Sequence, residues 1–286
     1  MSNEVSPAPA VGAVVAAEWN RDVLSVTGPD SISFLQGQLS ADVEALEVGS
    51  STLSLLLDPG GKMVAVLRLW RTDERIVFID TDAGSGAQVQ DRLSRFLLRT
   101  DAEITAHGWQ CVAVRGESSA SVDVSQTSAV LVGPCVWPGT EGLDLLGPSV
   151  SPPASAEPAP EGLLEALRIR SGWPTAAAEV TDDVIPAEIG SWLIGAAVSF
   201  TKGCYVGQEL TARIDSRGGN TPRNLRRFEV AQPARAGDAV LESGGGDGEP
   251  VGTLTSAVRD PRTDTTVALG YVKRGASESR LEVRPS

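Results

Sequence analysis

The sequence predicts an α+β fold that is followed by a small antiparallel β-barrel. Strand and helix patterns alternate irregularly through the first two thirds of the chain, which favours α+β over a doubly wound parallel sheet. Beyond Arg223, three strand-like segments are separated by turns rich in Gly, Pro and Asp, a spacing typical of a small barrel. At 286 residues the chain is long enough for two or three domains of roughly 100–200 residues each.

The first elements are a strand, an amphipathic helix and a hairpin. Residues 23–26 predict the strand. The helix carries its apolar residues at spacings of 3, 4 and 4, with Asp30 as N-cap and Gly49 just past its end: Ile32, Leu35, Leu39 and Val43. The turn DPGGK (58–62) predicts a hairpin between strands at 52–57 and 63–70. A further strand is expected at 75–80.

The middle of the chain predicts a second helix, two strands, a linker and a third helix. The second helix is marked by Val89, Leu93, Phe96 and Leu97, and the strands by residues 109–116 and 129–133. Residues 147–160 contain five prolines and predict an irregular linker. A short helix is expected from Glu161. The barrel strands are predicted by the segments NLRRFEV, VGTLTSAV and TVALGYV, with a turn at Gly244–Gly248.

Composition narrows the possible partners and the compartment. The chain has 24 Lys plus Arg and 37 Asp plus Glu, a net charge of −13, which excludes binding of duplex nucleic acid through a general positive field. Three separated cysteines and one histidine indicate neither a disulfide framework nor a metal site. The apolar run 10–17 has no basic flank and no run reaches membrane-spanning length, so we expect a cytoplasmic protein without membrane contact.

The most distinctive segment is SFTKGCYVGQELTAR, residues 199–213. Lys202 is one of three lysines in the chain and lies two residues before Cys204. In an extended backbone the side chains of Lys202 and Cys204 would point to the same side of the strand. In a loop that leads into a helix, the thiol could face the free backbone N–H groups of the helix N-terminus. Either geometry lowers a thiol pKa and favours a nucleophile, metal ligand or redox sensor. A buried cysteine in a tight turn is the competing interpretation.

The residues around this thiol also suggest a ligand site. Gly203 and Gly207 fit a backbone with positive φ or close approach of a ligand, and Gln208 and Glu209 begin an expected helix that runs to Arg213. Five arginines follow within fifteen residues, opposed by Asp215 alone: Arg213, Arg217, Arg223, Arg226 and Arg227. They are either a solvated surface or a site for an anionic ligand, RNA or a partner protein.

The motif KGCYVGQE (202–209) resembles that of the YgfZ-type folate-binding proteins, which are relatives of the glycine-cleavage T-protein, an aminomethyltransferase. Supporting blocks agree in order and approximate spacing over nearly the whole chain: VTGPDSISFLQGQLSADV (26–43), LLLDPGGKMVAVLRLWR (55–71), LLEALRIRSGWP (163–174), VIPAEIG (184–190) and VGTLTSAV…ALGYV (251–272). The resemblance implies a three-domain ring of two α+β domains, the first ferredoxin-like, and a C-terminal antiparallel β-barrel around a central folate site.

The resemblance also implies domain limits, ligands and roles. The first domain is expected to be discontinuous, at 1–48 and 160–216, the second at 49–147, the crossover at 148–159 and the barrel at 217–286. Tetrahydrofolate is the implied cofactor and iron-sulfur client proteins, including tRNA-modifying enzymes, are the implied partners. We interpret Cys204 and Lys202 as the functional pair and the neighbouring motif residues as the cofactor-binding set: Gly203, Tyr205, Gly207, Gln208, Glu209 and Arg213.

Two departures from the transferase pattern bear on the activity. Val64 and Ala65 stand where the aminomethyltransferase has paired aspartates, and Arg170 stands where it has a glutamate that holds the pterin. An apolar side chain cannot stabilise charge on a reacting amine. The sequence therefore favours a folate-binding accessory protein that supports iron-sulfur cluster assembly or repair through a reactive cysteine. A tetrahydrofolate-dependent aminomethyl or methyl transferase and an interaction module that has lost folate are the alternatives.

Overall fold

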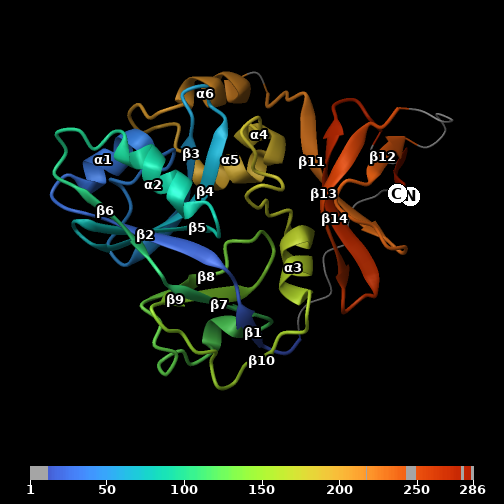
Figure 1. The fold of residues 1–286 in the computed structure, drawn as a ribbon, viewed down its shortest axis with the longest axis horizontal. Helices are drawn as coiled ribbons and strands as arrows, with labels where there is room; N and C mark the ends of the chain where they lie inside the picture. The colour runs from blue at the N-terminus through green and yellow to red at the C-terminus, as the bar shows by residue number, and fades with distance from the viewer. Residues whose placement is uncertain (1–11, 217, 243–248, 278–279, 285–286) are drawn as a thin grey trace.

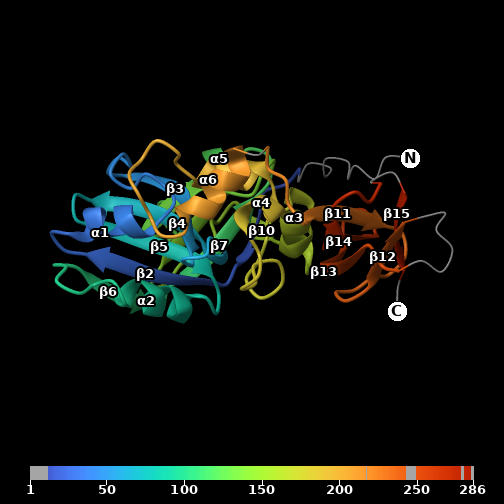
Figure 2. The same ribbon diagram turned by 90° about the horizontal axis from the view of Figure 1, so that it is seen from above.

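The computed structural model describes residues 12–216, 218–242, 249–277 and 280–284. Within them the strands form three five-stranded sheets. Figure 1 shows two sheets and their helices on one side of the molecule, the C-terminal sheet on the other, and between them the helices α3 (Leu163–Ser171), α4 (Pro186–Ile189) and α5 (Ser191–Ala197). Figure 2 shows that the molecule is elongated and flattened. Most of the expected apolar run 10–17 is described, whereas the expected turn at Gly244–Gly248 lies outside the described residues.

The first sheet is antiparallel throughout and carries two helices. Its strands, in spatial order, are β3 (Ser50–Leu57), β4 (Met63–Asp73), β5 (Ile76–Asp82), β2 (Arg21–Thr27) and β6 (Glu103–His107). Helices α1 (Ser31–Gln38) and α2 (Gly86–Ser94) pack on it through a core that includes Leu35, Leu67 and Val89. The expected hairpin and the following strand are confirmed.

The second sheet joins segments from three parts of the chain. Its strands, in spatial order, are β10 (Glu157–Pro158), β1 (Val15–Glu18), β7 (Gln110–Arg115), β9 (Gly142–Gly147) and β8 (Leu131–Pro134). A 3-10 turn occupies Ser119–Ser121. The expected strands β7 and β8 are confirmed. The expectation of a wholly irregular linker is wrong at one place, because Glu157 and Pro158 pair in parallel with β1.

The third sheet is the C-terminal antiparallel sheet. Its spatial order is β11 (Arg223–Val230), β14 (Thr265–Lys273), β13 (Gly252–Asp260), β12 (Ala239–Glu242) and β15 (Leu281–Arg284). Four helices connect this sheet to the first: α3 (Leu163–Ser171), α4 (Pro186–Ile189), α5 (Ser191–Ala197) and α6 (Gln208–Ser216). The three expected barrel strands and the α+β class are confirmed.

Two sequence expectations about the N-terminal half need correction. Helix α1 ends at Gln38 rather than near Gly49, because Leu39 is extended and bridges Leu56 of β3. The sheet pairing also crosses the expected domain limit at residue 48. Strand β2, from the expected first domain, pairs with β5 and β6 from the expected second.

Buried arginines join α3 to the C-terminal sheet. Arg170 contacts Asp260 of β13 at 2.7 Å and Glu229 of β11 at 2.6 Å, and its own exposed fraction is 5%. Arg168 pairs with Glu165 and with the fully buried Glu179. Where the transferase pattern has a pterin-binding glutamate, this chain therefore has a structural cation.

A second set of contacts converges on Glu179. Thr255 and Ser256 of β13 each donate a hydrogen bond of 2.6 Å to its carboxylate, and the Tyr271 hydroxyl donates to its backbone carbonyl. The apolar cluster around α3 likewise includes Leu225, Leu269 and residues of β3. The helices and the C-terminal sheet therefore share one core.

Arg170→Leu should lower the free energy of unfolding by about 3 kcal/mol, because Glu229 would lose its ion pair and the buried Asp260 would keep Arg262 alone as its cation. Urea unfolding measures the change. Arg259→Leu is the matched control, since its partner Asp264 is exposed and little change is expected. Equal destabilisation by both variants would contradict a special role for the Arg170 network.

Candidate functional site

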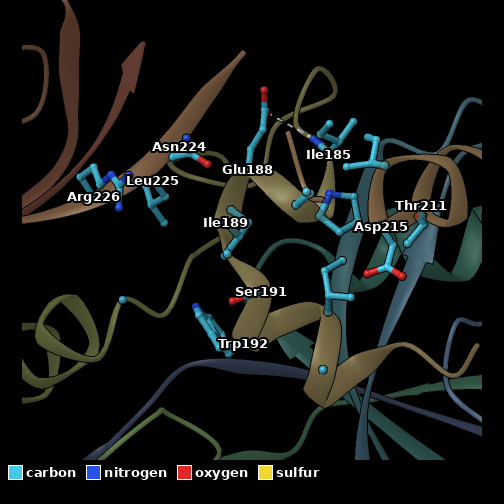
Figure 3. Close-up of a pocket in the computed structure, with 18 of the residues that line it drawn as sticks. Ile185, Glu188, Ile189, Ser191, Trp192, Thr211, Asp215, Asn224, Leu225 and Arg226 are labelled. Carbon is cyan, nitrogen blue, oxygen red and sulfur yellow. Dashed lines mark hydrogen bonds between the residues drawn. The ribbon is translucent and has the colours of Figure 1, made fainter. Parts of the chain in front are cut away.

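A cavity of about 880 Å³ lies between the central helices and β11. Figure 3 shows the β11 side chains at one wall, those of α6 at the opposite wall, and α4 and α5 between them. Its apolar lining includes Ile185, Ile189, Trp192, Ile194, Phe200, Leu210, Leu225 and Leu269. Its polar lining includes Glu188, Ser191, Thr211, Asp215, Asn224, Arg226 and Arg227. This volume and mixture are typical of a pocket for a small organic ligand.

An aromatic group forms part of the apolar wall. Trp192, at the start of α5, packs against the buried Trp173 with ring centroids 5.7 Å apart and planes inclined by 36°. Phe200 also lines the cavity and is half exposed. A flat heteroaromatic ligand could stack on such a wall.

The polar walls combine a buried carboxylate with two arginines. Burial raises the pKa of Glu188, and Arg223, 3.4 Å away, partly opposes this shift. The carboxylate also accepts a hydrogen bond from the Ile185 N–H at 3.4 Å. Arg227 donates to the Arg170 carbonyl and so holds its place beside the cavity. The cavity therefore offers both an acceptor and cations for a polar ligand.

Thr211 of α6 places an unsatisfied hydroxyl at this cavity. The residue is 5% exposed, and its Oγ1 has no hydrogen-bond partner of good geometry among the described residues. Burial raises the pKa of Tyr205, and the neighbouring Thr211 hydroxyl opposes this shift. A buried polar atom without a partner is costly, so a ligand or a water would satisfy Thr211.

Cys204, the predicted functional thiol, lies on a loop of residues 199–207 that leads into α6. Cys204 is free and exposed, so the interpretation of a buried structural cysteine does not hold. Phe200 before the thiol and Leu210 after it both line the cavity, although the motif residues 202–209 do not. The loop is therefore joined to the cavity at both ends.

Lys202 anchors this loop to the C-terminal end of α1. Its ammonium donates to three backbone carbonyls, those of Gln36, Leu39 and Ala41, at 2.6, 2.6 and 2.8 Å. Burial lowers the pKa of Lys202 to about 8, with Asp42 and Glu44 opposing the shift. All three N–H groups of the ammonium are used. The ammonium therefore caps the end of α1 and holds the extended residues that follow it. Activation of Cys204 by Lys202 stays a prediction.

The two glycines of the motif occupy different environments. Gly207 has φ +84°, and a Cβ there would lie 2.5 Å from the Asp58 carbonyl oxygen. Gly61, with φ +82°, would similarly meet Leu210 at 2.6 Å. These glycines let the 58–61 turn pack against the start of α6. A Cβ on Gly203 would meet no atom within 4 Å.

The other predicted cofactor-binding residues have mainly local roles. Tyr205 is buried in the core around α3 and its N–H donates to Gln208 Oε1. Glu209 and Arg213 are exposed on α6. The structure therefore brings the motif together as a loop and a helix start, but it does not place these side chains on the cavity wall.

The arginine cluster divides into several environments. Arg226 and Arg227 line the cavity, whereas Arg223 pairs with Asp183 and Glu188. Arg213 is exposed, and Arg217 lies outside the described residues. Two of the five arginines therefore lie at the cavity, at neighbouring positions of β11.

The remaining cysteines are packed in the second sheet and its margin. Burial raises the pKa of Cys111 well above its usual range and raises the pKa of Cys135 to about 12. Both are therefore protonated thiols near neutral pH. Cys204 is the exposed thiol among the three.

Sequence reasoning missed several cavity residues. Glu188 lies within the block VIPAEIG, which gave a usable signal, but no periodicity separated it from an ordinary helix carboxylate. Trp192 and Asp215 lie outside the motifs, and Thr211 lies in the segment 199–213 without having been selected as a site residue. Only the packing of α4, α5 and α6 against β11 brings them together.

Comparisons with known proteins agree with this arrangement. The family model of the glycine cleavage T-protein C-terminal barrel domain matches residues 223–285. An aminomethyltransferase T of the glycine cleavage system from Bartonella henselae has a TM-score of 0.75 at 19% identity, covering 92% of this chain and 79% of that one. By fold, the chain is a T-protein-like protein.

Two proteins that are similar in sequence narrow the class within the T-protein-like fold. An uncharacterized protein from Haemophilus influenzae is 29% identical over 244 residues, which is 82% of this chain and 81% of that protein. The tRNA-modifying protein YgfZ of Serratia proteamaculans is 28% identical over 291 residues, 92% of this chain and 85% of that protein. These relatives support a protein of the YgfZ type, as the motif predicted.

No helix among the described residues is both long enough and apolar enough to cross a membrane.

Lys202→Met should lower the free energy of unfolding by about 2 kcal/mol, because three carbonyls at the end of α1 would lose a charged donor. Amide exchange around residues 39–41 should accelerate. Urea unfolding and hydrogen exchange measure these effects. Lys62→Met, at an exposed lysine, is the control. If both variants are equally stable, the anchoring role of Lys202 is refuted.

Proposed function

We propose that this protein binds a folate in the cavity and acts as an accessory factor for iron-sulfur enzymes, including those that modify tRNA. The observation that carries the proposal is the amphipathic cavity, which has an aromatic wall at Trp192 and two arginines on β11. Tetrahydrofolate has a matching division between a planar pterin and an anionic glutamate tail. The T-protein-like fold and the YgfZ relatives support the same ligand class.

The residues present fit this ligand chemically. Trp192 and Phe200 supply apolar surface for the pterin and its aromatic linker, and Glu188 and Thr211 supply hydrogen-bonding groups. Arg226 and Arg227 supply cations for carboxylates. A bound tetrahydrofolate would supply a carrier for one-carbon units. The contribution of the protein is to hold it and to exclude water from the apolar wall.

The surroundings of Val64 and Ala65 argue for binding rather than group transfer. Ala65 is 3% exposed in the core of the first sheet, and Val64 packs against the same cluster. Neither offers a carboxylate to a reacting amine. We therefore do not propose the aminomethyl transfer carried out by the structural relative's class.

We assign the proposed support of iron-sulfur enzymes to the thiol of Cys204. The thiol is exposed on a loop that Lys202 fixes to α1 and that Gly207 joins to the 58–61 turn. An exposed thiol on an anchored loop can meet a protein partner without rearrangement of the core. Support for iron-sulfur clients comes from the resemblance of the motif, and the relatives are named tRNA-modifying proteins.

Gly195→Phe should abolish tetrahydrofolate binding. Gly195 lies on α5 at the cavity wall, and a Cβ there would meet no atom within 4 Å, so the ring can fill the cavity without breaking contacts. Isothermal titration calorimetry under anaerobic conditions measures binding, and circular dichroism checks the fold. Gly195→Ala is the matched control and should still bind. Unchanged affinity in Gly195→Phe would place folate elsewhere.

Cys204→Ser should fail to restore iron-sulfur enzyme activity in a strain that lacks this protein, although the wild type restores it. The exposed position predicts that the variant folds normally. Gly203→Ala is the control on the same loop, because its added methyl group meets no neighbour. Full rescue by Cys204→Ser would remove the thiol from the proposed function and leave folate binding untouched.

A further inference from the structure

A basic and apolar patch lies at the C-terminal end of α2, in the segment RLSRFLLR (92–99). It consists of three arginines and two exposed apolar residues: Arg92, Arg95, Phe96, Leu98 and Arg99. The exposed fractions of Phe96 and Leu98 are 42% and 85%. The expected second helix placed Phe96 on its apolar face, but α2 ends at Ser94 and the ring faces solvent.

The arginines of this patch differ from most others in the described part of the chain. The side chains of Arg95 and Arg99 make no hydrogen bond or ion pair with any described residue. Elsewhere many arginines pair with carboxylates, among them Arg21, Arg68, Arg115, Arg168, Arg170 and Arg262. In an acidic chain, unpaired arginines beside exposed apolar side chains indicate a surface available to an anion.

Arg92 links these cations to the exposed ring. Its guanidinium lies 4.5 Å from the centroid of Phe96 and donates one long hydrogen bond, 3.5 Å, to the Leu57 carbonyl. Burial lowers the pKa of Arg92, and Arg95 lowers it further, while Asp58 opposes the shift. Two like charges therefore lie close together, and Asp58 and the exposed Asp91 are the nearby acids. An added anion would stabilise this arrangement.

We propose that this patch binds single-stranded RNA. Cations spaced along a short segment suit successive phosphates, and an exposed aromatic ring beside a guanidinium suits stacking of an unpaired base. A duplex hides its bases and would meet the negative field of the remaining surface, so it is disfavoured. The site is local and small, and strong salt dependence is expected.

The patch is connected to the thiol loop through the first hairpin. Arg92 reaches the Leu57 carbonyl, and Leu57 and Asp58 are the residues against which Gly207 packs. The patch therefore contacts, through Arg92, a segment that also supports the start of α6. This inference does not depend on folate binding or on Cys204.

Fluorescence anisotropy with a labelled oligouridylate of about 12 nucleotides tests the proposal at about 50 mM salt. Arg95→Ala/Arg99→Ala should weaken binding about tenfold and reduce the slope of log affinity against log salt by about 1.4 in magnitude. Phe96→Ala should weaken binding about tenfold with the slope unchanged, and Phe96→Trp should retain it. Arg259→Ala, at an exposed arginine on β13, is the control.

The outcomes separate the possible partners. All substituted side chains of the patch are exposed, so circular dichroism should show unchanged folding. Absence of oligouridylate binding by the wild type, or equal binding by all variants, overturns the proposal. Tighter binding of a duplex of equal length also overturns it. A patch that leaves RNA unbound would then be a candidate surface for an acidic protein segment.

Discussion

The carboxylate of Glu179 holds together the two sides of the cavity. It has no exposed surface, accepts hydrogen bonds from Thr255 and Ser256 of β13, and pairs with Arg168 of α3. A buried charge of this kind is tolerable only when its acceptors are satisfied, so α3 and the C-terminal sheet have a fixed relation. The β11 wall of the cavity, with Arg226 and Arg227, takes its position from that relation.

The distinctive motif supports the site mainly from outside the cavity. Lys202 caps α1, Gly207 accommodates the 58–61 turn, and Tyr205 enters the core. Each fixes the path of the backbone on which Cys204 is exposed. A motif can therefore be distinctive because it shapes a loop and a helix start, while the cavity wall is formed by residues outside positions 202–209, such as Trp192 and Thr211.

The sequence predicted the elements whose causes are local. The 58–62 turn residues fix the first hairpin, and the apolar run of β14, which is buried almost throughout, is visible within its own segment. It did not predict the end of α1, because the capping ammonium of Lys202 comes from 163 residues beyond Leu39. It also missed short strands such as β1 and β12, whose partners lie far along the chain. The cavity depends on packing of this long-range kind.

The net charge of −13 does not show which arginines pair with carboxylates and which do not. Many of them neutralise carboxylates inside the molecule, as Arg21 does with Asp80 and Asp82, and so give no positive potential to the surface. The exposed surface is consequently left with the unpaired acids, which repel polyanions at a distance. An anionic ligand can be held only where a few arginines lie near the surface or a cavity without a matching acid. Arg95 and Arg99 after α2 are such a place, because their side chains pair with no acid among the described residues, and the cavity carries Arg226 and Arg227 on its β11 wall.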